Sequence, residues 1–201
     1  MLDARQLDLE RGGRQLFRAL SFSLAAGEAL RISGANGRGK TSLLRILCGL
    51  LAPQAGAVRW KGEPVGELRE DYARQLVYIG HAPAVKDELT AAENLSIACR
   101  IAGNARTAGE IAQALQRLEV PATAFLKKLS QGQCRRAALA RLALSRSIPL
   151  WLLDEPLAAL DAQAARLVEG LISEHIGQGG IVVYTTHQGA RIEGKVISLD
   201  A

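Results

Sequence analysis

Gly34-Ala35-Asn36-Gly37-Arg38-Gly39-Lys40-Thr41 is the stretch of sequence that decides the fold. It matches the pattern Gly-x-x-x-x-Gly-Lys-[Ser/Thr], and it lies between an apolar strand predicted over residues 29–33 and a helix predicted over residues 41–50. In a chain of this composition the pattern would arise by chance in roughly half a percent of sequences. Because the pattern and its strand–loop–helix setting agree, we interpret the segment as a phosphate-binding loop.

Each residue type in this loop has a part in holding a triphosphate. Glycines let consecutive backbone N–H groups wrap the β-phosphate at a helix start, where unpaired donors and the helix dipole favour anions. Lys40 adds a positive charge for the β- and γ-phosphates, the Thr41 hydroxyl is placed to bind Mg²⁺, and Ser42 lies near the α-phosphate. The predicted ligand is a nucleoside triphosphate with Mg²⁺, and the loop does not specify the base. The residues predicted to contact it are Gly34, Ala35, Asn36, Gly37, Arg38, Gly39, Lys40, Thr41 and Ser42.

Two acidic residues follow the apolar run at residues 150–153. Asp154 and Glu155 therefore stand at the carboxyl end of a predicted strand, the edge at which open α/β sheets bind ligands. Since the loop implies a metal, we predict that Asp154 binds Mg²⁺ and that Glu155 orients and deprotonates the attacking water. His187 follows another apolar strand and is predicted to donate to the γ-phosphate. Glu155, His187 and Lys40 are the predicted catalytic residues for phosphoryl transfer to water.

Strands and helices alternate in the second half of the chain. Apolar strands are predicted over residues 150–153, 181–185 and 196–199, and an amphipathic helix over residues 162–176. Continuous apolar strands separated by helices indicate a mainly parallel sheet that is buried on both faces. The predicted fold class is therefore α/β.

Two further parts surround this predicted core. Further short strands are expected at residues 6–9, 22–24, 58–61 and 76–79, with the charged run 67–74 as a connection. Three Ala/Leu/Arg-rich helices are predicted at residues 91–101, 107–118 and 130–146. We interpret residues 90–146 as a helical lobe inserted into a single domain that spans residues 1–201.

Composition disfavours disorder, a membrane span and secretion. The 201 residues are 48% apolar and 22% charged, ordinary values for a globular domain. No window approaches about 18 uncharged apolar residues, and Asp3 and Arg5 stand where a secretory peptide needs an apolar stretch.

The net charge of +5 suits an anionic ligand, nucleic acid or a membrane face without selecting among them. Cys48, Cys99 and Cys134 lack metal-site spacing and are expected to be buried hydrophobes in a reducing compartment.

Ser130 and Gln133 form the pattern Ser-x-x-Gln at the start of the third helix of the predicted lobe. This pattern is a capping box, in which the two side chains satisfy backbone groups at the helix start. A helix start with an exposed serine and a glycine, here Gly132, can also bind an anion. The residues alone leave both interpretations open.

In this order and spacing, the motifs resemble the nucleotide-binding subunits of ABC transporters over nearly the whole chain. The most specific element is Leu-Ser-x-Gly-Gln at residues 129–133, which other phosphate-loop enzymes lack. The resemblance implies the parallel core, antiparallel β lobe and inserted helical lobe of an ABC ATPase. It also implies an ATP-sandwiched homodimer, in which Ser130 and Gly132 contact the γ-phosphate held by the opposite subunit, with Gln133 beside them. Asp161 would lie in the loop that signals across this dimer.

A closer resemblance is to the haem-exporter ATPase subunits of c-type cytochrome biogenesis. It is carried by residues 80–83, 86–90, 93–95, 149–156 and 185–188. The resemblance implies an ATP-hydrolysing subunit that works with membrane-spanning transporter subunits. It further implies a peripheral position on the cytoplasmic face of the inner membrane, with no nucleic acid as partner.

The sequence departs from the ABC pattern at several positions. His81-Ala82 stand where most ABC ATPases have a glutamine that touches Mg²⁺ and senses the membrane partner, which leaves metal contact there open. Arg11 stands where an aromatic residue usually stacks on adenine, and its planar guanidinium is also able to stack on a base. Arg38 replaces a small residue in the phosphate loop and Gln131 replaces a glycine in the second anion site. Neither change removes a residue with a chemical role.

Other functions are compatible with the residues taken alone. The chain could be the ATPase subunit of an ABC transporter for another cargo. A soluble nucleotide switch or nucleic-acid-dependent ATPase is suggested by Arg135, Arg136 and Arg141. We expect these arginines to form a solvated helix face, and no aromatic platform for bases is apparent in the sequence. A module that binds nucleotide without hydrolysing it is disfavoured by Glu155 and His187.

Overall fold

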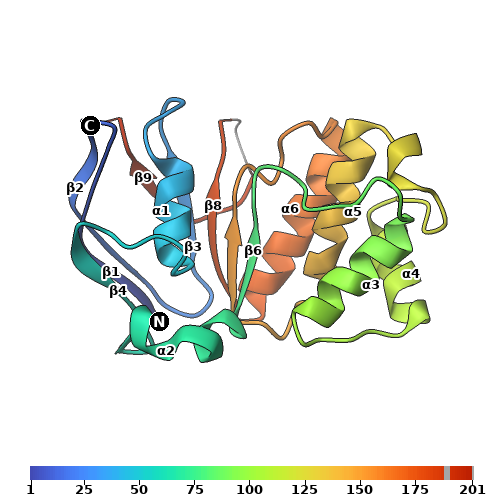
Figure 1. Ribbon diagram of the computed structural model, residues 1–201, viewed down its shortest axis with the longest axis horizontal. Coiled ribbons are helices and arrows are strands. Elements are labelled where there is room, and N and C mark those ends of the chain that lie inside the picture. The colour runs from blue at the N-terminus through green and yellow to red at the C-terminus, as the bar shows by residue number, and fades with distance from the viewer. Residues whose placement is uncertain (188–190, 201) are drawn as a thin grey trace.

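The computed structural model describes residues 1–187 and 191–200, and its centre is a fully parallel sheet with the order β6-β7-β8-β3-β9 (Figure 1). The five strands are β3 (Ala29–Ser33), β6 (Leu76–Ile79), β7 (Leu150–Leu153), β8 (Ile181–Thr185) and β9 (Lys195–Ser198). The strands β7, β8 and β3 are direct neighbours, so their carboxyl ends lie at one edge of the sheet. The segments that follow these three strands are therefore brought together.

An antiparallel sheet with the order β2-β1-β4-β5 packs beside the parallel one. Its strands are β1 (Leu2–Arg11), β2 (Arg14–Leu24), β4 (Ala55–Trp60) and β5 (Glu63–Pro64). The predictions of strands at 6–9 and 22–24 were therefore too short. Register shifts interrupt the pairing of β1 with β2, and Gln6 and Ala19 have positive φ angles of 48° and 49°. These irregularities break the period-two pattern that marks a strand in a sequence.

Seven helical segments complete the described part of the chain. They are α1 (Lys40–Leu47), α2 (Val65–Ala73), α3 (Ala91–Ile101), α4 (Ala108–Arg117), the 3-10 turn η1 (Leu126–Lys128), α5 (Gln131–Ala143) and α6 (Ala162–Gly177). The sequence prediction missed α2, because its charged residues are exposed and only Tyr72 is buried. The Tyr72 hydroxyl donates to the Leu47 carbonyl at 2.6 Å, which anchors this helix to the end of α1.

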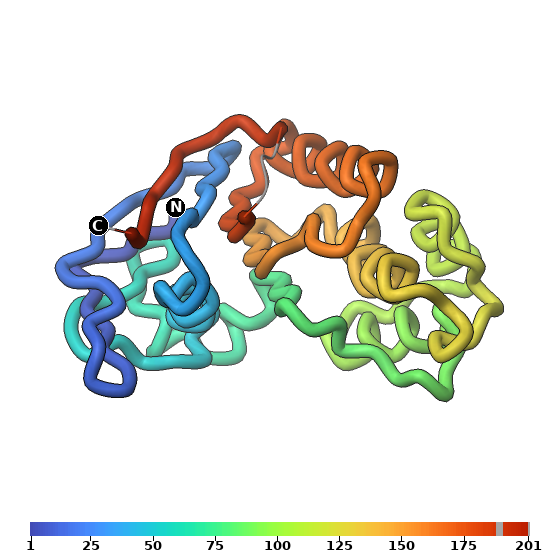
Figure 2. Tube along the Cα trace, turned by 90° about the horizontal axis from the view of Figure 1, so that it is seen from above, coloured from blue at the N-terminus to red at the C-terminus, as the bar shows by residue number. Residues whose placement is uncertain are grey.

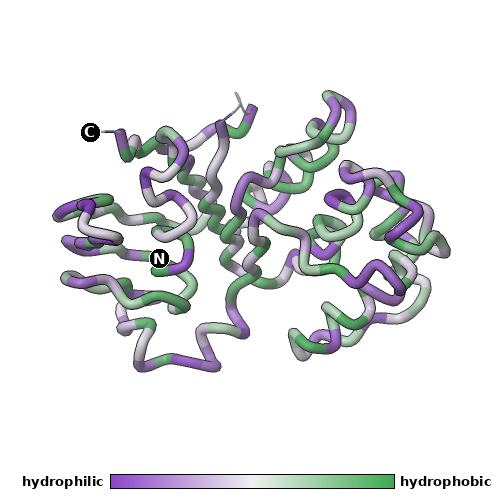
Figure 3. Tube along the Cα trace, turned by 45° about the horizontal axis from the view of Figure 1, so that its top comes forward, coloured by the Kyte–Doolittle hydropathy of each residue, from purple (hydrophilic) through white to green (hydrophobic). Residues whose placement is uncertain are grey.

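Two hydrophobic clusters lie on opposite faces of the parallel sheet. In β7, Leu150 and Leu152 face the cluster that includes α1 and the antiparallel sheet, whereas Trp151 and Leu153 face the cluster formed with α3 to α6. The continuous apolar run therefore supplies both faces, as expected of a central parallel strand. Figure 2 shows the antiparallel sheet and the helical region on opposite sides of the molecule, and Figure 3 shows hydrophobic segments running through its centre. The predicted α/β class with an antiparallel lobe and a helical lobe is confirmed.

Among the described residues, no helix is long and apolar enough to cross a membrane. The three cysteines are free thiols: Cys99 is buried, whereas Cys48 and Cys134 are partly buried. Burial raises the pKa of Cys48 to about 12, so this thiol is protonated at neutral pH.

His175 makes the stability of the fold dependent on pH. Its ring stacks on Trp151 with a centroid distance of 3.8 Å and is 2% exposed. Burial lowers the pKa of His175 to about 4 from an ordinary 6.5, and the nearby Pro149 carbonyl offsets only part of this effect. His175 therefore binds a proton more tightly in the unfolded chain than in the folded one. The contribution of neutral His175 to the free energy of unfolding is complete above about pH 6.5 and is lost as the pH falls toward about 4.

We expect the free energy of unfolding, measured with urea, to fall by about 2 kcal/mol between about pH 7.5 and pH 5 because of His175. His175→Phe keeps a flat ring against Trp151 but has no proton to gain. The variant should therefore lose less stability than the wild type over this interval. Equal pH slopes for the two proteins would contradict the assignment.

Candidate active site

The loop between β3 and α1 is shaped by its glycines. Gly39 is the residue before α1 and has a φ of 95°, a left-handed conformation that side chains rarely adopt. A Cβ at this position would lie 3.1 Å from the Leu16 Cβ. Gly39 is therefore required both for the turn and for the close approach of β2, and α1 begins directly at Lys40.

Lys40 is held at the centre of the loop. Its Nζ donates to the carbonyls of Gly34 at 2.7 Å and Ala35 at 3.1 Å, and lies 3.0 Å from the His187 Nε2. The residue is only 7% exposed. A buried ammonium paired with neutral acceptors favours the approach of an anion.

A chain of hydroxyl groups connects the loop to the acidic pair. The Thr41 Oγ1 donates to Asp154 Oδ2 at 2.8 Å, and the Thr185 Oγ1 donates to Asp154 Oδ1 at 2.8 Å. The Thr185 Oγ1 also accepts from the Glu155 backbone N–H at 2.8 Å. Asp154 is 1% exposed, so both carboxylate oxygens are fixed by groups from two other elements. Sequence reasoning missed Thr185, whose role depends on the adjacency of β7 and β8.

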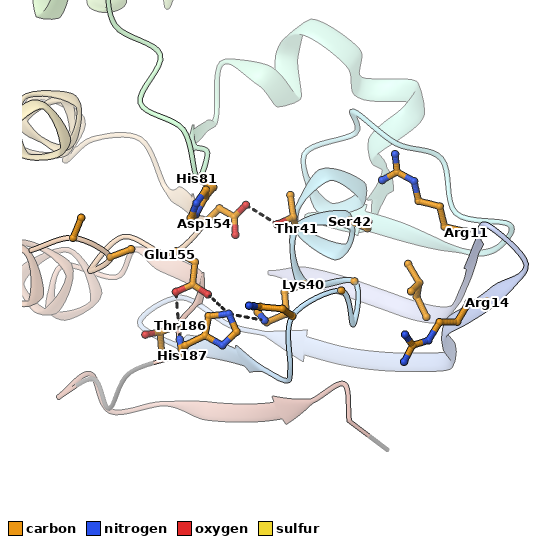
Figure 4. Close-up of a pocket in the computed structure, with 16 residues that line it drawn as sticks. Arg11, Arg14, Lys40, Thr41, Ser42, His81, Asp154, Glu155, Thr186 and His187 are labelled. Carbon is orange, nitrogen blue, oxygen red and sulfur yellow. Dashed lines mark hydrogen bonds and ion pairs between the residues drawn. The ribbon is translucent and has the colours of Figure 1, made fainter. Parts of the chain in front are cut away.

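His187 lies between Lys40 and Glu155 (Figure 4). The His187 Nε2 lies 3.2 Å from Glu155 Oε1, and the His187 backbone N–H donates to Glu155 Oε2 at 3.3 Å. The contact with Glu155 needs a proton on Nε2, whereas the contact with Lys40 needs a bare Nε2. A single neutral tautomer therefore serves one of the two contacts. Glu155 has a positive φ of 51°, which turns its side chain out of the strand direction.

These residues line an open cleft of about 800 Å³. From the loop side it is lined by Asn36, Gly37, Gly39, Lys40, Thr41 and Ser42. Asp154, Glu155, Thr186 and His187 line the opposite side. Arg11, Arg14 and Leu16 reach it from the β1–β2 hairpin, and the exposed His81 reaches it from the end of β6 (Figure 4). The described residues Gly34, Ala35 and Arg38 do not line the cleft, although the sequence prediction placed them in contact with the ligand.

Arg135 is not part of a solvated helix face, contrary to the sequence prediction, and Arg136 and Arg141 are only partly exposed. Arg135 is 4% exposed, and its guanidinium crosses from α5 to the segments that follow β6 and β7. It donates to the carbonyls of Gly80 at 2.8 Å, His81 at 3.0 Å, Asp154 at 2.8 Å and Glu155 at 2.9 Å. Burial lowers the pKa of Arg135, and the carboxylates of Asp154 and Glu155 oppose the shift. The guanidinium nevertheless stays charged, as arginine does in proteins.

Ser130, Gly132 and Gln133, in the turn that starts α5, do not line this cleft. The Ser130 Oγ accepts from the Gln133 N–H at 3.2 Å, and the Gln133 Oε1 accepts from the Ser130 N–H at 2.9 Å. The capping-box interpretation is thus confirmed, while Ser130 itself is exposed. A Cβ at Gly132 would lie 2.9 Å from the Ala159 carbonyl oxygen, so the turn packs directly on the loop before α6. In that loop, the Asp161 carboxylate accepts from the Ala164 N–H at 2.8 Å and caps α6.

Thr185→Val should destabilise the fold by about 1–3 kcal/mol, because it leaves Asp154 Oδ1 and the Glu155 N–H without their buried partner. Valine has nearly the same shape as threonine, so packing is preserved. Thermal and urea unfolding measure the loss. Thr185→Ser keeps the hydroxyl and is expected to stay closer to the wild type than the valine variant does. The reverse order of stabilities would contradict the bridging role.

Comparisons with known proteins agree on one family. The ABC transporter family matches residues 17–158. Proteins named cytochrome c biogenesis ATP-binding export protein CcmA are similar over most of their length. The protein from Aromatoleum aromaticum is 50% identical over 94% of this chain and 90% of its own. The protein from Escherichia coli K12 is 46% identical over 98% of this chain and 94% of its own.

Solved structures have the same fold. An ABC transporter ATP-binding protein from Pyrococcus furiosus has a TM-score of 0.84 at 23% identity, covering 98% of this chain and 96% of its own. An ATP-binding cassette solved as a dimer with ADP and Pi has a TM-score of 0.80 at 23% identity, covering 94% of this chain and 88% of its own.

Proposed function

Since the chain belongs to the ABC transporter ATP-binding family, we propose that it hydrolyses ATP to drive a membrane transporter that serves haem export or delivery in c-type cytochrome biogenesis. The observation that carries this proposal is the convergence of Lys40, Asp154, Glu155 and His187 on one cleft. The relatives named for cytochrome c biogenesis match nearly the whole chain, which supports this process over other ABC transport.

ATP is the nucleotide bound by this family, and we propose that it binds with Mg²⁺. The donors fit this metal: the Thr41 hydroxyl and the Asp154 carboxylate are oxygens, 2.8 Å apart, and Asp154 is buried. Mg²⁺ is commonly held by one or two protein oxygens together with phosphates and water. This agrees with the absence, among the described residues, of a larger cluster of metal-binding side chains. When bound, the ion would neutralise charge that develops on the phosphates.

The residues of the cleft divide the chemistry between them. The Lys40 ammonium donates to the Gly34 and Ala35 carbonyls. When ATP binds, it replaces part of these hydrogen bonds with hydrogen bonds to phosphate oxygens. Glu155 accepts a proton from the attacking water, and the backbone N–H of His187 holds its Oε2 in place. The His187 ring, which lies next to both Lys40 and Glu155, donates to the γ-phosphate. Arg11 and Arg14 line the cleft from the β1–β2 hairpin, and the planar guanidinium of Arg11 stacks on the base.

We propose that two copies of the chain sandwich two ATP molecules. Ser130, Gly132 and Gln133 are exposed or partly exposed and lie outside the cleft of their own chain, so they are free to complete the site of a second copy. The start of α5 has unpaired N–H donors that suit a γ-phosphate. The resemblance of this turn to the Leu-Ser-x-Gly-Gln element supports the same arrangement. Asp161 would then signal between the two sites.

We further propose that residues 1–201 act as one ATP-binding unit. In this proposal the unit docks as a peripheral subunit on membrane-spanning partners at the cytoplasmic face of the inner membrane. The support is the family, whose members work with membrane subunits. Co-purification of these partners from detergent-solubilised membranes tests this placement.

Lys40→Ala should weaken ATP binding by about 10- to 100-fold, because a charge-assisted contact with the phosphates is removed. Calorimetric titration with ATP measures the change. Lys127→Ala removes an exposed lysine that contacts the Phe125 ring and serves as the matched control. Similar losses in both variants would contradict a specific role for Lys40.

The same variant tests the dimer. A chain with Lys40→Ala keeps an intact Ser130 turn, and a chain with Ser130→Arg keeps an intact phosphate loop. Each alone is expected to hydrolyse ATP poorly, whereas their mixture forms one complete site per mixed dimer and regains activity. A mixture no more active than its parts would argue that the turn does not act across a dimer.

A further inference from the structure

The Asp200 carboxylate contacts the phosphate loop but does not itself line the cleft. Its Oδ1 accepts from the Ala35 backbone N–H at 2.8 Å and lies 3.4 Å from the Arg38 Nε. These are two of the loop residues that do not line the cleft. One carboxylate oxygen therefore joins two points of the loop that are separated by two residues.

The end of the sheet fixes the place of this carboxylate. Strand β9 pairs in parallel with β3, and the Leu199 N–H continues the pairing by donating to the Ser33 carbonyl at 3.0 Å. The Leu199 side chain is 4% exposed and belongs to the cluster formed with α1. The Asp200 N–H donates to the Ser198 Oγ at 3.3 Å. The backbone that carries Asp200 is thus anchored on the strand from which the loop departs.

Asp200 and Lys40 hold opposite sides of one peptide group. The Ala35 N–H that donates to Asp200 and the Gly34 carbonyl that accepts from Lys40 at 2.7 Å belong to the same peptide. Because a peptide is planar, fixing the direction of its N–H also fixes the direction of its carbonyl. Asp200 therefore sets the acceptor on which the Lys40 ammonium rests.

The contact with Arg38 adds an electrostatic part. The side chains of Arg38 and Asp200 are 35% and 49% exposed, so the pair is screened and its direct contribution to stability is small. The ion pair instead sets the direction of the Arg38 side chain, whose guanidinium points toward Asp200 and does not line the cleft beside Lys40.

We propose that Asp200 is a positioning residue for ATP binding, which acts through the Gly34–Ala35 peptide on Lys40. The proposal rests on the proposed function, since it assigns a role within the same ATP site. Without Asp200, the peptide and the Lys40 ammonium must be ordered when ATP binds, which weakens binding. Asp154 and Glu155 keep their contacts with Thr41 and Thr185, so kcat should change much less than the affinity for ATP.

The test compares Asp200→Ala with Asp200→Asn in the full-length chain. Asp200→Ala removes the acceptor and should raise both the Kd for ATP and the KM by about tenfold, with kcat within about twofold of the wild type. Asp200→Asn keeps an oxygen that can accept from Ala35 and should restore both constants to within about threefold of the wild type. Glu193→Ala removes an exposed carboxylate near the start of β9 and is the control for loss of one negative charge. The Kd is measured calorimetrically with ATP in the presence of a chelator, and KM and kcat are measured with Mg²⁺ and ATP.

Two results would overturn the inference. A wild-type Kd in Asp200→Ala would show that the carboxylate does not position the loop. Equal weakening in the alanine and asparagine variants would show that the charge, and not the hydrogen bond to Ala35, is responsible. A wild-type chain that neither binds nor hydrolyses ATP would instead refute the proposed function, so the two failures are distinguishable.

Discussion

Glu155→Gln is expected to lower the rate of ATP hydrolysis by about 10²- to 10⁴-fold, the range that a positioned general base contributes. The glutamine amide has the shape of the carboxylate and is able to accept from the His187 N–H, a contact now made by Glu155 Oε2 at 3.3 Å. It cannot take a proton from water. The phosphate loop and Lys40 are untouched, so the affinity for ATP should stay within a few-fold of the wild type.

Two measurements check this expectation. Phosphate release reports turnover, and size-exclusion chromatography with and without ATP reports whether the stalled variant accumulates as a dimer. Glu63→Gln changes an exposed glutamate in β5 and is the matched control. Undiminished turnover in Glu155→Gln would refute its role as the base. ATP retained by a strict monomer would refute the sandwich.

Arg135→Ala is expected to destabilise the protein by about 3–5 kcal/mol. The guanidinium is 4% exposed and donates to four carbonyls, two after β6 and two after β7. Alanine leaves these acceptors buried without donors and opens a cavity. Because two of the carbonyls belong to Asp154 and Glu155, hydrolysis should fall along with stability.

Urea unfolding at neutral pH measures the loss, and ATP-binding stoichiometry shows what fraction of the variant is folded. Arg74→Ala is the control, since the Arg74 guanidinium lies 3.4 Å from the Glu70 carboxylate and the two side chains are 70% and 87% exposed. Such pairs contribute about 0–1 kcal/mol. Comparable losses from both arginines would mean that the buried contacts of Arg135 contribute little.

The sequence was most informative where the chemistry is local. The loop glycines, Lys40 and Thr41 form one uninterrupted motif, and Asp154 and Glu155 follow an apolar run of central-strand type. The strands β3, β6, β7 and β8 begin and end at the predicted residues, because buried parallel strands bounded by polar residues have a clear pattern. The cleft brings together loop residues and strand-end residues that the sequence prediction assigned to one site.

Contacts between distant segments could not be predicted in this way. Thr185 acts on Asp154 only because β8 lies beside β7, and Asp200 reaches Ala35 across 165 positions. Arginine is usually found on protein surfaces. The sequence around Arg135 does not indicate that its guanidinium is buried and donates to four carbonyls. The full length of β1 and β2 and the helix α2 were missed for another reason: bulges and an exposed charged surface weaken the hydrophobic period.

The distribution of tryptophan gives the protein a pair of built-in optical reporters. The chain has two tryptophans: Trp60 lies in the cluster with α1 and the antiparallel sheet, and Trp151 lies in the cluster with α3 to α6. After Trp60→Phe, the remaining emission comes from Trp151 alone, and its neighbour His175 is a quencher when it carries a proton. Comparing the fluorescence of such a variant with that of Trp151→Phe therefore reveals whether the two halves of the molecule melt in one cooperative step or in succession.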